Sequence, residues 1–228
     1  RIANFDDLDP LRLEPDISVD IVEPGRALPG DAALILIPGS KSTIGDLADL
    51  RAQGWDVDIA AHVRRGGRVL GICGGYQMLG RKVHDPDGLE GPAGSADGLA
   101  LLDVETVLTP EKALTRVTGT AATGQPVSGY EIHIGRTDGP DRARPFATID
   151  DGSGPHRDGA TSVSGQVAGS YLHGMFSDDS FRRNFLASLG ATHFSDIGFN
   201  AEIDRVLDRL ADHLEVHLDT QTLFGLAR

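Results

Sequence analysis

The first third of the chain alternates between two patterns of apolar residues. Residues 32–37 (Ala-Ala-Leu-Ile-Leu-Ile) and 68–72 (Arg-Val-Leu-Gly-Ile) are short, nearly continuous apolar runs, which is typical of parallel strands buried on both faces. Between them, residues 56–65 carry apolar positions at helical spacing and end in basic residues before two glycines, which predicts a helix. A second helix is expected to begin at Gly74. This order predicts an α/β fold with a mostly parallel central sheet flanked by helices.

The middle of the chain has a different pattern and predicts additional antiparallel strands. β-Branched and aromatic residues recur in short stretches separated by Gly, Pro and Asp, which favours strands joined by turns. The stretches are residues 101–107, 113–123, 125–134 and 147–149. Residues 17–22 alternate like a strand, and the chain begins at Arg1 in a strand-like segment.

The last part of the chain predicts one more strand and two helices. Residues 163–171 are a β-prone run, and residues 178–189 have an acidic first turn with Gly190 after their end, as a helix requires. Residues 201–218 form an amphipathic helical pattern, with apolar positions at Ile203, Val206, Leu207, Leu210 and Leu214. We therefore expect a globular domain over residues 1–190 and a C-terminal helical extension over residues 191–228.

Charge and composition exclude several classes of function. The 228 residues carry 21 Lys and Arg against 34 Asp and Glu, a net charge of −13, which is unsuited to binding nucleic acid or an anionic membrane. No apolar run reaches the roughly 18 residues of a membrane span. With one cysteine, the chain forms no internal disulfide and no multi-cysteine zinc site, so we expect a cytoplasmic protein without a metal centre.

The single cysteine lies where the second predicted strand meets a helix. The sequence Gly71-Ile72-Cys73-Gly74-Gly75 has the pattern of a nucleophile elbow, in which a sharp turn exposes the nucleophile and glycines allow close packing around it. A cysteine that merely fills the core needs no such glycines. We interpret Cys73 as a nucleophile, with the backbone N–H of Gly74 as one donor to an oxyanion.

A thiol nucleophile needs a base, and the chain has eight histidines. Most of them fall on predicted helices or loops. His173 instead follows the β-prone run and precedes a glycine, and catalytic residues of open α/β sheets gather at the carboxyl ends of strands. We therefore predict that His173 acts with Cys73.

Residues 38–43 (Pro-Gly-Ser-Lys-Ser-Thr) follow the first buried strand and look superficially like a phosphate-binding loop. The glycine spacing of that motif is absent, so we do not predict a nucleotide site here. A Pro-Gly turn at a strand end can instead present backbone N–H groups to the oxyanion. Gly39 and Ser40 are therefore expected to form the second wall of the oxyanion hole with Gly74.

Five segments in this order resemble the class I (triad-type) glutamine amidotransferases, and among them the branch that serves corrinoid amidation. The resemblance covers nearly the whole chain. The segments are residues 1–11, 38–43, 71–80, 129–137 (Gly-Tyr-Glu-Ile-His-Ile-Gly-Arg-Thr) and 171–176 (Tyr-Leu-His-Gly-Met-Phe). The resemblance implies a flavodoxin-like fold and hydrolysis of glutamine through a cysteinyl thioester, with Cys73 as nucleophile and His173 as base.

The resemblance also implies a glutamine-binding pocket that includes Gln77, Tyr130, Glu131 and His133. The wider class places a glutamate two residues after the histidine to complete a triad, but the chain has Met175 there.

A third member of the triad therefore stays open, with Glu131, Asp178 and Asp179 as candidates. Our hypothesis is that a thiolate, already strong near neutral pH, depends less on a carboxylate to orient the imidazole.

The resemblance implies partners beyond glutamine. Ammonia would pass to a synthetase domain, dependent on ATP and Mg²⁺, that precedes this segment in the same polypeptide and amidates carboxylates of a corrinoid, cobyrinic acid a,c-diamide. No cofactor is expected in the present domain. Three alternatives stay open: a stand-alone amidotransferase subunit of a peptidoglycan-amidating ligase, a cysteine hydrolase with the same elbow, and a silent docking module.

Overall fold

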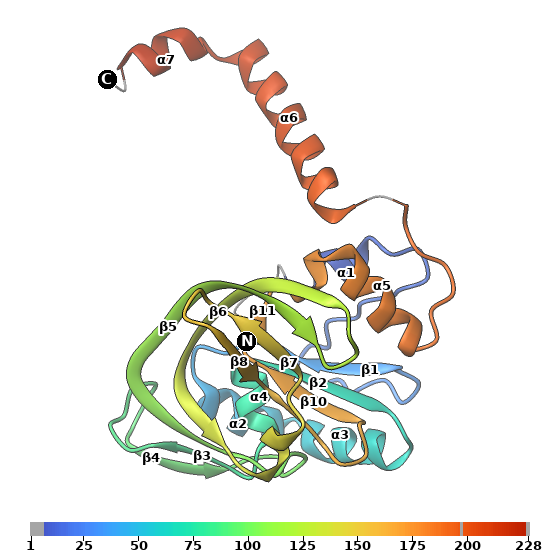
Figure 1. The fold of residues 1–228 in the computed structure, drawn as a ribbon, viewed down its shortest axis with the longest axis vertical. Coiled ribbons are helices and arrows are strands. Elements are labelled where there is room, and N and C mark those ends of the chain that lie inside the picture. Colours follow the sequence, from blue (N-terminus) through green and yellow to red (C-terminus); the bar gives the residue numbers. More distant parts are fainter. Residues whose placement is uncertain (1–6, 197, 227–228) are drawn as a thin grey trace.

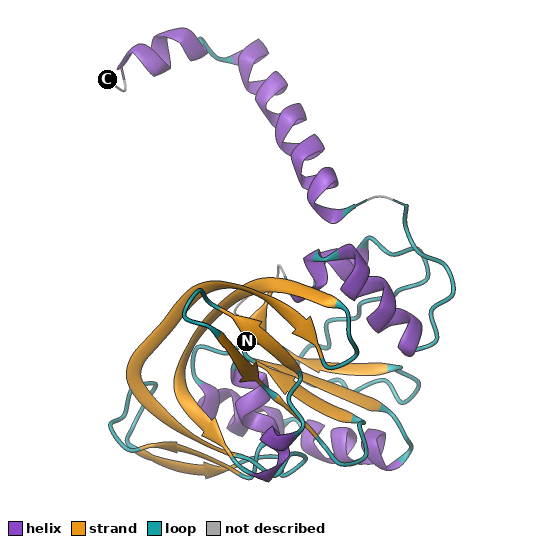
Figure 2. Ribbon diagram, viewed as in Figure 1, coloured by secondary structure: helices purple, strands orange, loops and turns teal. Residues whose placement is uncertain are grey.

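The computed structural model describes residues 7–196 and 198–226, and Figures 1 and 2 show its elements. The expected strand at Arg1 lies outside the described residues. The first sheet has the order β1-β2-β10-β9, in which the first three strands are parallel and β9 is an antiparallel edge. These strands are β1 (Leu34–Ile37), β2 (Arg68–Ile72), β10 (Val167–Ser170) and β9 (Ala160–Thr161). The predicted α/β class with a mostly parallel central sheet is confirmed.

Helices separate the parallel strands along the chain, as the sequence predicts. The expected helix between the first two strands is α3, and α4 begins at the predicted Gly74. Two helices of this part, α1 and α2, were not expected, and residues 38–43, which lead into α2, were interpreted only as a turn. The helices of this part are α1 (Asp9–Arg12), α2 (Thr43–Ala52), α3 (Trp55–Arg64) and α4 (Gly74–Leu79).

A second sheet curls around the body of the domain and is dominated by two long antiparallel strands, β5 and β6 (Figure 2). Its main order is β11-β6-β5-β3-β4, and β7 pairs with both β5 and β8. The strands are β3 (Lys82–Asp85), β4 (Gly94–Asp97), β5 (Glu105–Ala121), β6 (Pro126–Asp138), β7 (Ala147–Asp150), β8 (Pro155–Asp158) and β11 (Leu172–His173).

Three strand predictions differ from the structure. The expected strands 101–107 and 113–123 are one strand, β5, whose register shifts between Val107 and Lys112; Pro110 lies in this interval and cannot donate to the ladder. Residues 17–22 form a loop, with Ile17 and Val19 against the core. The strand expected from residue 163 begins only at Val167, because residues 162–165 form a turn.

The C-terminal part contains the predicted helices and one more. Asp178 accepts a hydrogen bond from the Phe181 N–H and so caps α5, as its acidic start predicts. The amphipathic helix α6 extends away from the body of the domain and has no buried residue (Figure 1). The remaining elements are η1 (Pro140–Ala143), η2 (Met175–Ser177), α5 (Asp179–Ser188), α6 (Phe199–His217) and α7 (Thr220–Leu226).

Within the described part of the chain, no helix is both long and apolar enough to cross a lipid bilayer.

A buried arginine holds the N-terminal segment on the domain. Arg182 of α5 is fully buried and donates to the carboxylates of Glu14 and Asp179, each at 2.7 Å, and to the Phe176 carbonyl at 2.8 Å. Glu14, itself 2 % exposed, also accepts a hydrogen bond from the Ser195 N–H. The pair of Arg182 and Glu14 thus joins the N-terminal segment to α5 and to the segment that follows α5.

Removing this guanidinium should strongly destabilise the domain, because the Glu14 carboxylate would remain buried without its partner. We expect Arg182→Met to lower the free energy of unfolding by about 3–5 kcal/mol, measured by urea denaturation. Arg205→Met on α6 is the control: Arg205 is exposed and its partner Glu202 is half-buried, so a change within about 0.5 kcal/mol is expected. Equal effects of the two substitutions would contradict the anchoring role of Arg182.

Candidate active site

Cys73 occupies a strained backbone position between β2 and α4. Its φ of 53° and ψ of −112° lie outside the regions that non-glycine residues usually adopt. The turn is packed too closely for a side chain at Gly75, whose Cβ would lie 2.0 Å from the Ile37 carbonyl oxygen at the end of β1. The predicted elbow is therefore present, and it presses against the neighbouring strand.

The catalytic pair predicted from the sequence is brought together at the carboxyl ends of the strands. A Cβ built on Gly39 would lie 3.7 Å from Cys73 Cβ and 3.0 Å from His173 Cε1. The Cys73 thiol donates a hydrogen bond to the Ile132 carbonyl at 3.5 Å, and its proximity to the imidazole contributes to the raised pKa of His173. Both side chains are largely buried, with Cys73 8 % and His173 1 % exposed.

A carboxylate from the start of the chain completes the arrangement. Asp7 Oδ2 lies 2.7 Å from His173 Nδ1, and Asp7 Oδ1 accepts the Gly174 N–H at 2.8 Å. Asp7 is fully buried and lies 166 residues before the histidine. Because the carboxylate accepts a hydrogen bond from Nδ1–H, Nε2 is left to face the sulfur. Cys73, His173 and Asp7 therefore form a triad.

This carboxylate corrects the interpretation of the third member of the triad. The open candidates have other partners: Glu131 pairs with His133 and His156, Asp178 caps α5, and Asp179 pairs with Arg182. The hypothesis that the thiolate tolerates a missing carboxylate rested on a wrong premise.

Met175, at the position of the usual glutamate, is fully buried in the core. Residues 6–7, Asp-Asp, belong to a segment that supported the family resemblance, but no local spacing related them to His173.

The electrostatics of the site favour a protonated imidazole. Burial lowers the pKa of His173, but the hydrogen bonds to Asp7 and Cys73 and the negative charges of these groups outweigh it and raise the pKa to about 9. The protonated imidazole lies beside the sulfur and can donate its proton to a departing group. The triad is thus suited to nucleophilic attack followed by proton donation.

The predicted oxyanion turn packs directly on the elbow. A Cβ on Gly74 would lie 2.9 Å from the Ser40 backbone nitrogen, so the Ser40 backbone packs against Gly74. Gly74 is the first residue of α4, and its N–H has no partner inside the helix. The Ser40 side chain stabilises the turn itself: its hydroxyl donates to Asp46 at 2.6 Å and accepts the Ser42 N–H at 3.0 Å.

A loop from the second sheet holds this turn in place through a hydrogen bond that no sequence pattern predicted. Glu90, in the loop between β3 and β4, accepts the Thr43 N–H at 2.5 Å at the start of α2. The buried carboxylate of Asp85 accepts the N–H groups of Leu89 and Glu90 and so shapes the loop. Burial raises the pKa of Glu90, although its hydrogen bonds from Thr43 act in the opposite direction.

Gln77 lies one turn along α4 from the nucleophile but points into the protein. It is 2 % exposed; its Oε1 accepts the Thr43 hydroxyl at 3.0 Å, and its Nε2 donates to the Ile134 carbonyl at 3.0 Å and the Tyr171 hydroxyl at 3.2 Å. Its amide links α2, α4 and β6. The role toward glutamine that the resemblance implies for it stays a prediction.

The three other residues expected in the glutamine pocket lie on β6 beside the triad. Tyr130 pairs with His173 across β6 and β11, and its ring stacks on the imidazole with centroids 5.3 Å apart. The next residue, Glu131, is 3.7 Å from His133 Nε2, and His133 stacks on Tyr171 at 3.7 Å. Tyr130 is thus next to the reacting groups, whereas Glu131 and His133 interact mainly with each other and with neighbours.

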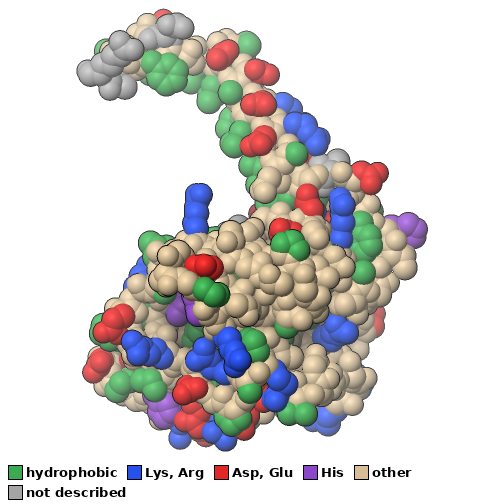
Figure 3. All heavy atoms as spheres, viewed as in Figure 1, with side chains coloured by type: hydrophobic (Ala, Val, Ile, Leu, Met, Phe, Trp, Pro, Cys, Tyr) green, Lys and Arg blue, Asp and Glu red, His purple; other side chains and the backbone are tan. Residues whose placement is uncertain are grey.

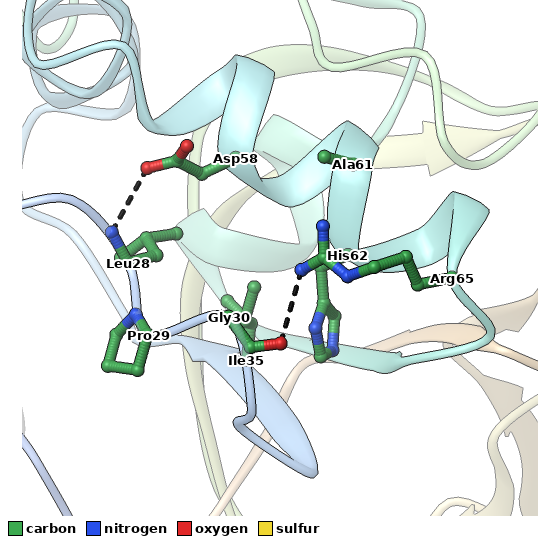
Figure 4. A pocket seen from close by; sticks show the side chains of 8 residues that line it. All are labelled: Leu28, Pro29, Gly30, Ile35, Asp58, Ala61, His62 and Arg65. Carbon is green, nitrogen blue, oxygen red and sulfur yellow. Dashed lines mark hydrogen bonds between the residues drawn. The ribbon is translucent and has the colours of Figure 1, made fainter.

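A separate cavity of about 150 Å³ lies between the segment before β1 and α3 (Figure 4). Its polar groups already have partners: Asp58 accepts the Leu28 N–H, Arg65 donates to the Gly30 carbonyl, and His62 Nε2 lies 3.0 Å from the Arg68 carbonyl. No residue of the triad lines it. We therefore assign the chemistry to the triad and not to this cavity.

Comparisons with known proteins agree with this geometry. The family model described as "CobB/CobQ-like glutamine amidotransferase domain" matches residues 1–181. Proteins named cobyric acid synthase from Paracoccus denitrificans and Bradyrhizobium diazoefficiens are 64% and 61% identical over the whole chain, which covers 46% of each. The chain therefore spans about half the length of the curated relatives that it matches.

A solved structure shares the fold. The structure of PurLQS from Thermotoga maritima matches with a TM-score of 0.56 and 19% identity, over 81% of this chain and 92% of that chain. On the family match, which extends over most of its length, the chain belongs to the CobB/CobQ-like glutamine amidotransferase domain family.

Proposed function

We propose that this chain hydrolyses glutamine and delivers the ammonia to corrinoid amidation in cobalamin biosynthesis, as the glutaminase part of a cobyric acid synthase. The observation that carries the proposal is the buried triad of Cys73, His173 and Asp7 on a strained elbow. The names of the full-length relatives support the corrinoid branch over a peptidoglycan-amidating ligase.

In the first half-reaction, the Cys73 thiolate adds to the side-chain amide carbon of glutamine. The carbon–sulfur bond forms as the carbonyl π electrons move to oxygen, and the backbone N–H groups of Gly74 and the Gly39-Ser40 turn stabilise this oxyanion. His173 Nε2 then gives its proton to the departing nitrogen. Ammonia leaves, and a γ-glutamyl thioester remains on Cys73.

In the second half-reaction, neutral His173 takes a proton from water as the water oxygen attacks the thioester carbon. The carbon–sulfur bond breaks, glutamate leaves and the thiolate returns with an imidazolium beside it. Asp7 remains ionised throughout, because its role is to hold the ring and to stabilise the positive charge.

The ammonia acceptor and its activation lie outside this chain in the proposal. An ATP- and Mg²⁺-dependent synthetase domain of the same polypeptide would activate carboxylates of cobyrinic acid a,c-diamide. We place the reaction in the cytoplasm, where both glutamine and ATP are available. Nothing in the proposed half-reactions at Cys73 requires a metal or a cofactor.

A glutamine analogue that carries a diazo-ketone tests the proposed function. We expect the analogue to alkylate Cys73 and glutamine to block this labelling, which is measured by mass spectrometry. Cys73→Ser should abolish both the labelling and the release of glutamate, which is measured by a glutamate assay. Cleavage of a peptide ester without glutamine hydrolysis would instead favour the cysteine hydrolase. An inert Cys73 would favour the docking module.

The Asp7 carboxylate sets the pH range of the reaction. Its charge stabilises the imidazolium, so Asp7→Asn should lower the pKa of His173 from about 9 and lower kcat about 100-fold or more. The alkaline limb of the pH–rate profile, where the imidazolium loses its proton, should move to lower pH. Asp9→Asn, on the exposed side of α1, is the control. An unmoved alkaline limb in Asp7→Asn would contradict this role.

Glu90 is expected to support the oxyanion turn through Thr43. Glu90→Ala removes the acceptor at the start of α2, and we expect about a 10-fold loss of kcat with little change in KM, smaller than the loss of a direct oxyanion donor. Glu90→Gln keeps an acceptor oxygen and should retain most of the activity. The exposed neighbour Asp87→Ala is the matched control. An unchanged kcat in Glu90→Ala would exclude this role.

A further inference from the structure

The helix α6 presents an apolar face that nothing in the described structure covers. Its 19 residues include no buried side chain, and hydrophobic side chains are visible along the helix beyond the body of the domain (Figure 3). The exposed fractions of the face range from 40% to 54%, for Ile203, Val206, Leu207, Leu210 and Leu214.

An amphipathic helix of this kind needs a surface to pack on. Most of the stability of helices in proteins comes from packing an apolar face, because isolated helices are marginal in water. The other side of α6 is polar and forms ion pairs: the guanidinium groups of Arg205 and Arg209 lie 2.6 and 3.9 Å from the Glu202 carboxylate. The sequence thus separates a solvent face from a contact face.

The width of the apolar face favours a broad folded surface over a second copy of the same helix. Ile203, Leu207, Leu210 and Leu214 alone would form the narrow seam of a coiled coil. Val206 widens the seam on one side and Ala211 on the other, giving the wider stripe that packs onto a globular core.

The extent of the matches to known proteins indicates that the surface that receives α6 belongs to a longer polypeptide. The family model of the amidotransferase domain ends at residue 181, before α6. The cobyric acid synthases, by contrast, align over the whole chain, including α6 and α7, and extend to about twice its length. The helix is therefore a feature shared with the longer synthases and lies beyond the part matched by the general domain family.

We propose that α6 docks its apolar face onto the synthetase half of the same polypeptide and holds the glutaminase against it. The docking rests on the proposed function, since that function supplies the second domain. One flank of α6 carries Asp204, Asp208 and Glu215, whereas Arg209 lies on the other flank with Glu202. The surface that receives the helix should therefore be an apolar groove with basic residues along the side that faces the acidic flank.

Crosslinking tests the occupant of this face in the full-length polypeptide. A photoreactive residue is placed at Leu210 and, as control, at Asp212 on roughly the opposite side of the helix. We expect irradiation at position 210 to give a crosslink to the synthetase half within one polypeptide, and position 212 to give far less. A crosslink between two copies, a crosslink only to residues 7–190, or no crosslink at position 210 would each overturn the proposal.

An activity assay separates docking from the proposed function. Leu207→Asp with Leu210→Asp, in the full-length polypeptide, should lower glutamine-dependent amidation at least 10-fold and leave amidation with added ammonium salt unchanged. Asp212→Asn is the matched control. Unchanged glutamine-dependent amidation in the double variant would overturn the docking role.

Labelling of Cys73 by the diazo-ketone is measured in the same samples. Loss of docking leaves this labelling and the ammonium-dependent reaction intact. Failure of the proposed function would appear in the unsubstituted protein, as absent labelling or as no corrinoid amidation from either nitrogen source.

Discussion

The hydrogen bond between His173 and Asp7 is the interaction on which the site depends. It joins two almost completely buried groups from opposite ends of the domain sequence, and a buried charge is tolerated only where it is paired. The pairing fixes the ring, leaves Nε2 for the sulfur and raises the pKa of the imidazole. It also requires the N-terminal segment to stay in place, which the buried contact of Glu14 with Arg182 provides.

The rest of the site is built by close approach of backbones rather than by many side chains. Cys73 keeps its positive φ because the elbow is held against the end of β1, and the Gly39-Ser40 turn fills the space beside it. The contacts of Glu90 and Gln77 with Thr43 then fix the start of α2 and, with it, this turn. The strained elbow at Cys73 and the Gly39-Ser40 turn are thus supported by side chains that lie outside the triad.

Sequence patterns predicted the parallel sheet, the elbow and the pairing of Cys73 with His173, since each leaves a local sign: an apolar run, a glycine pattern, or a histidine at a strand end. They divided β5 in two, because Pro110 interrupts its pattern while the bulge keeps the strand continuous. They treated 38–43 as a turn and missed α2, whose first N–H groups are satisfied partly by Glu90, 47 residues away. Local signals carry no information about such partners.

The fold class, the elbow at Cys73 and the amphipathic character of α6 could be predicted from the sequence, because glycine placement and apolar periodicity act locally on the backbone. Which carboxylate pairs with His173 became visible only in the folded chain. Several acidic residues lie closer in sequence to His173 than Asp7 does, but each has a different partner, a helix cap or an ion pair. The choice follows from which chain segment is folded against the imidazole, and sequence distance does not encode that.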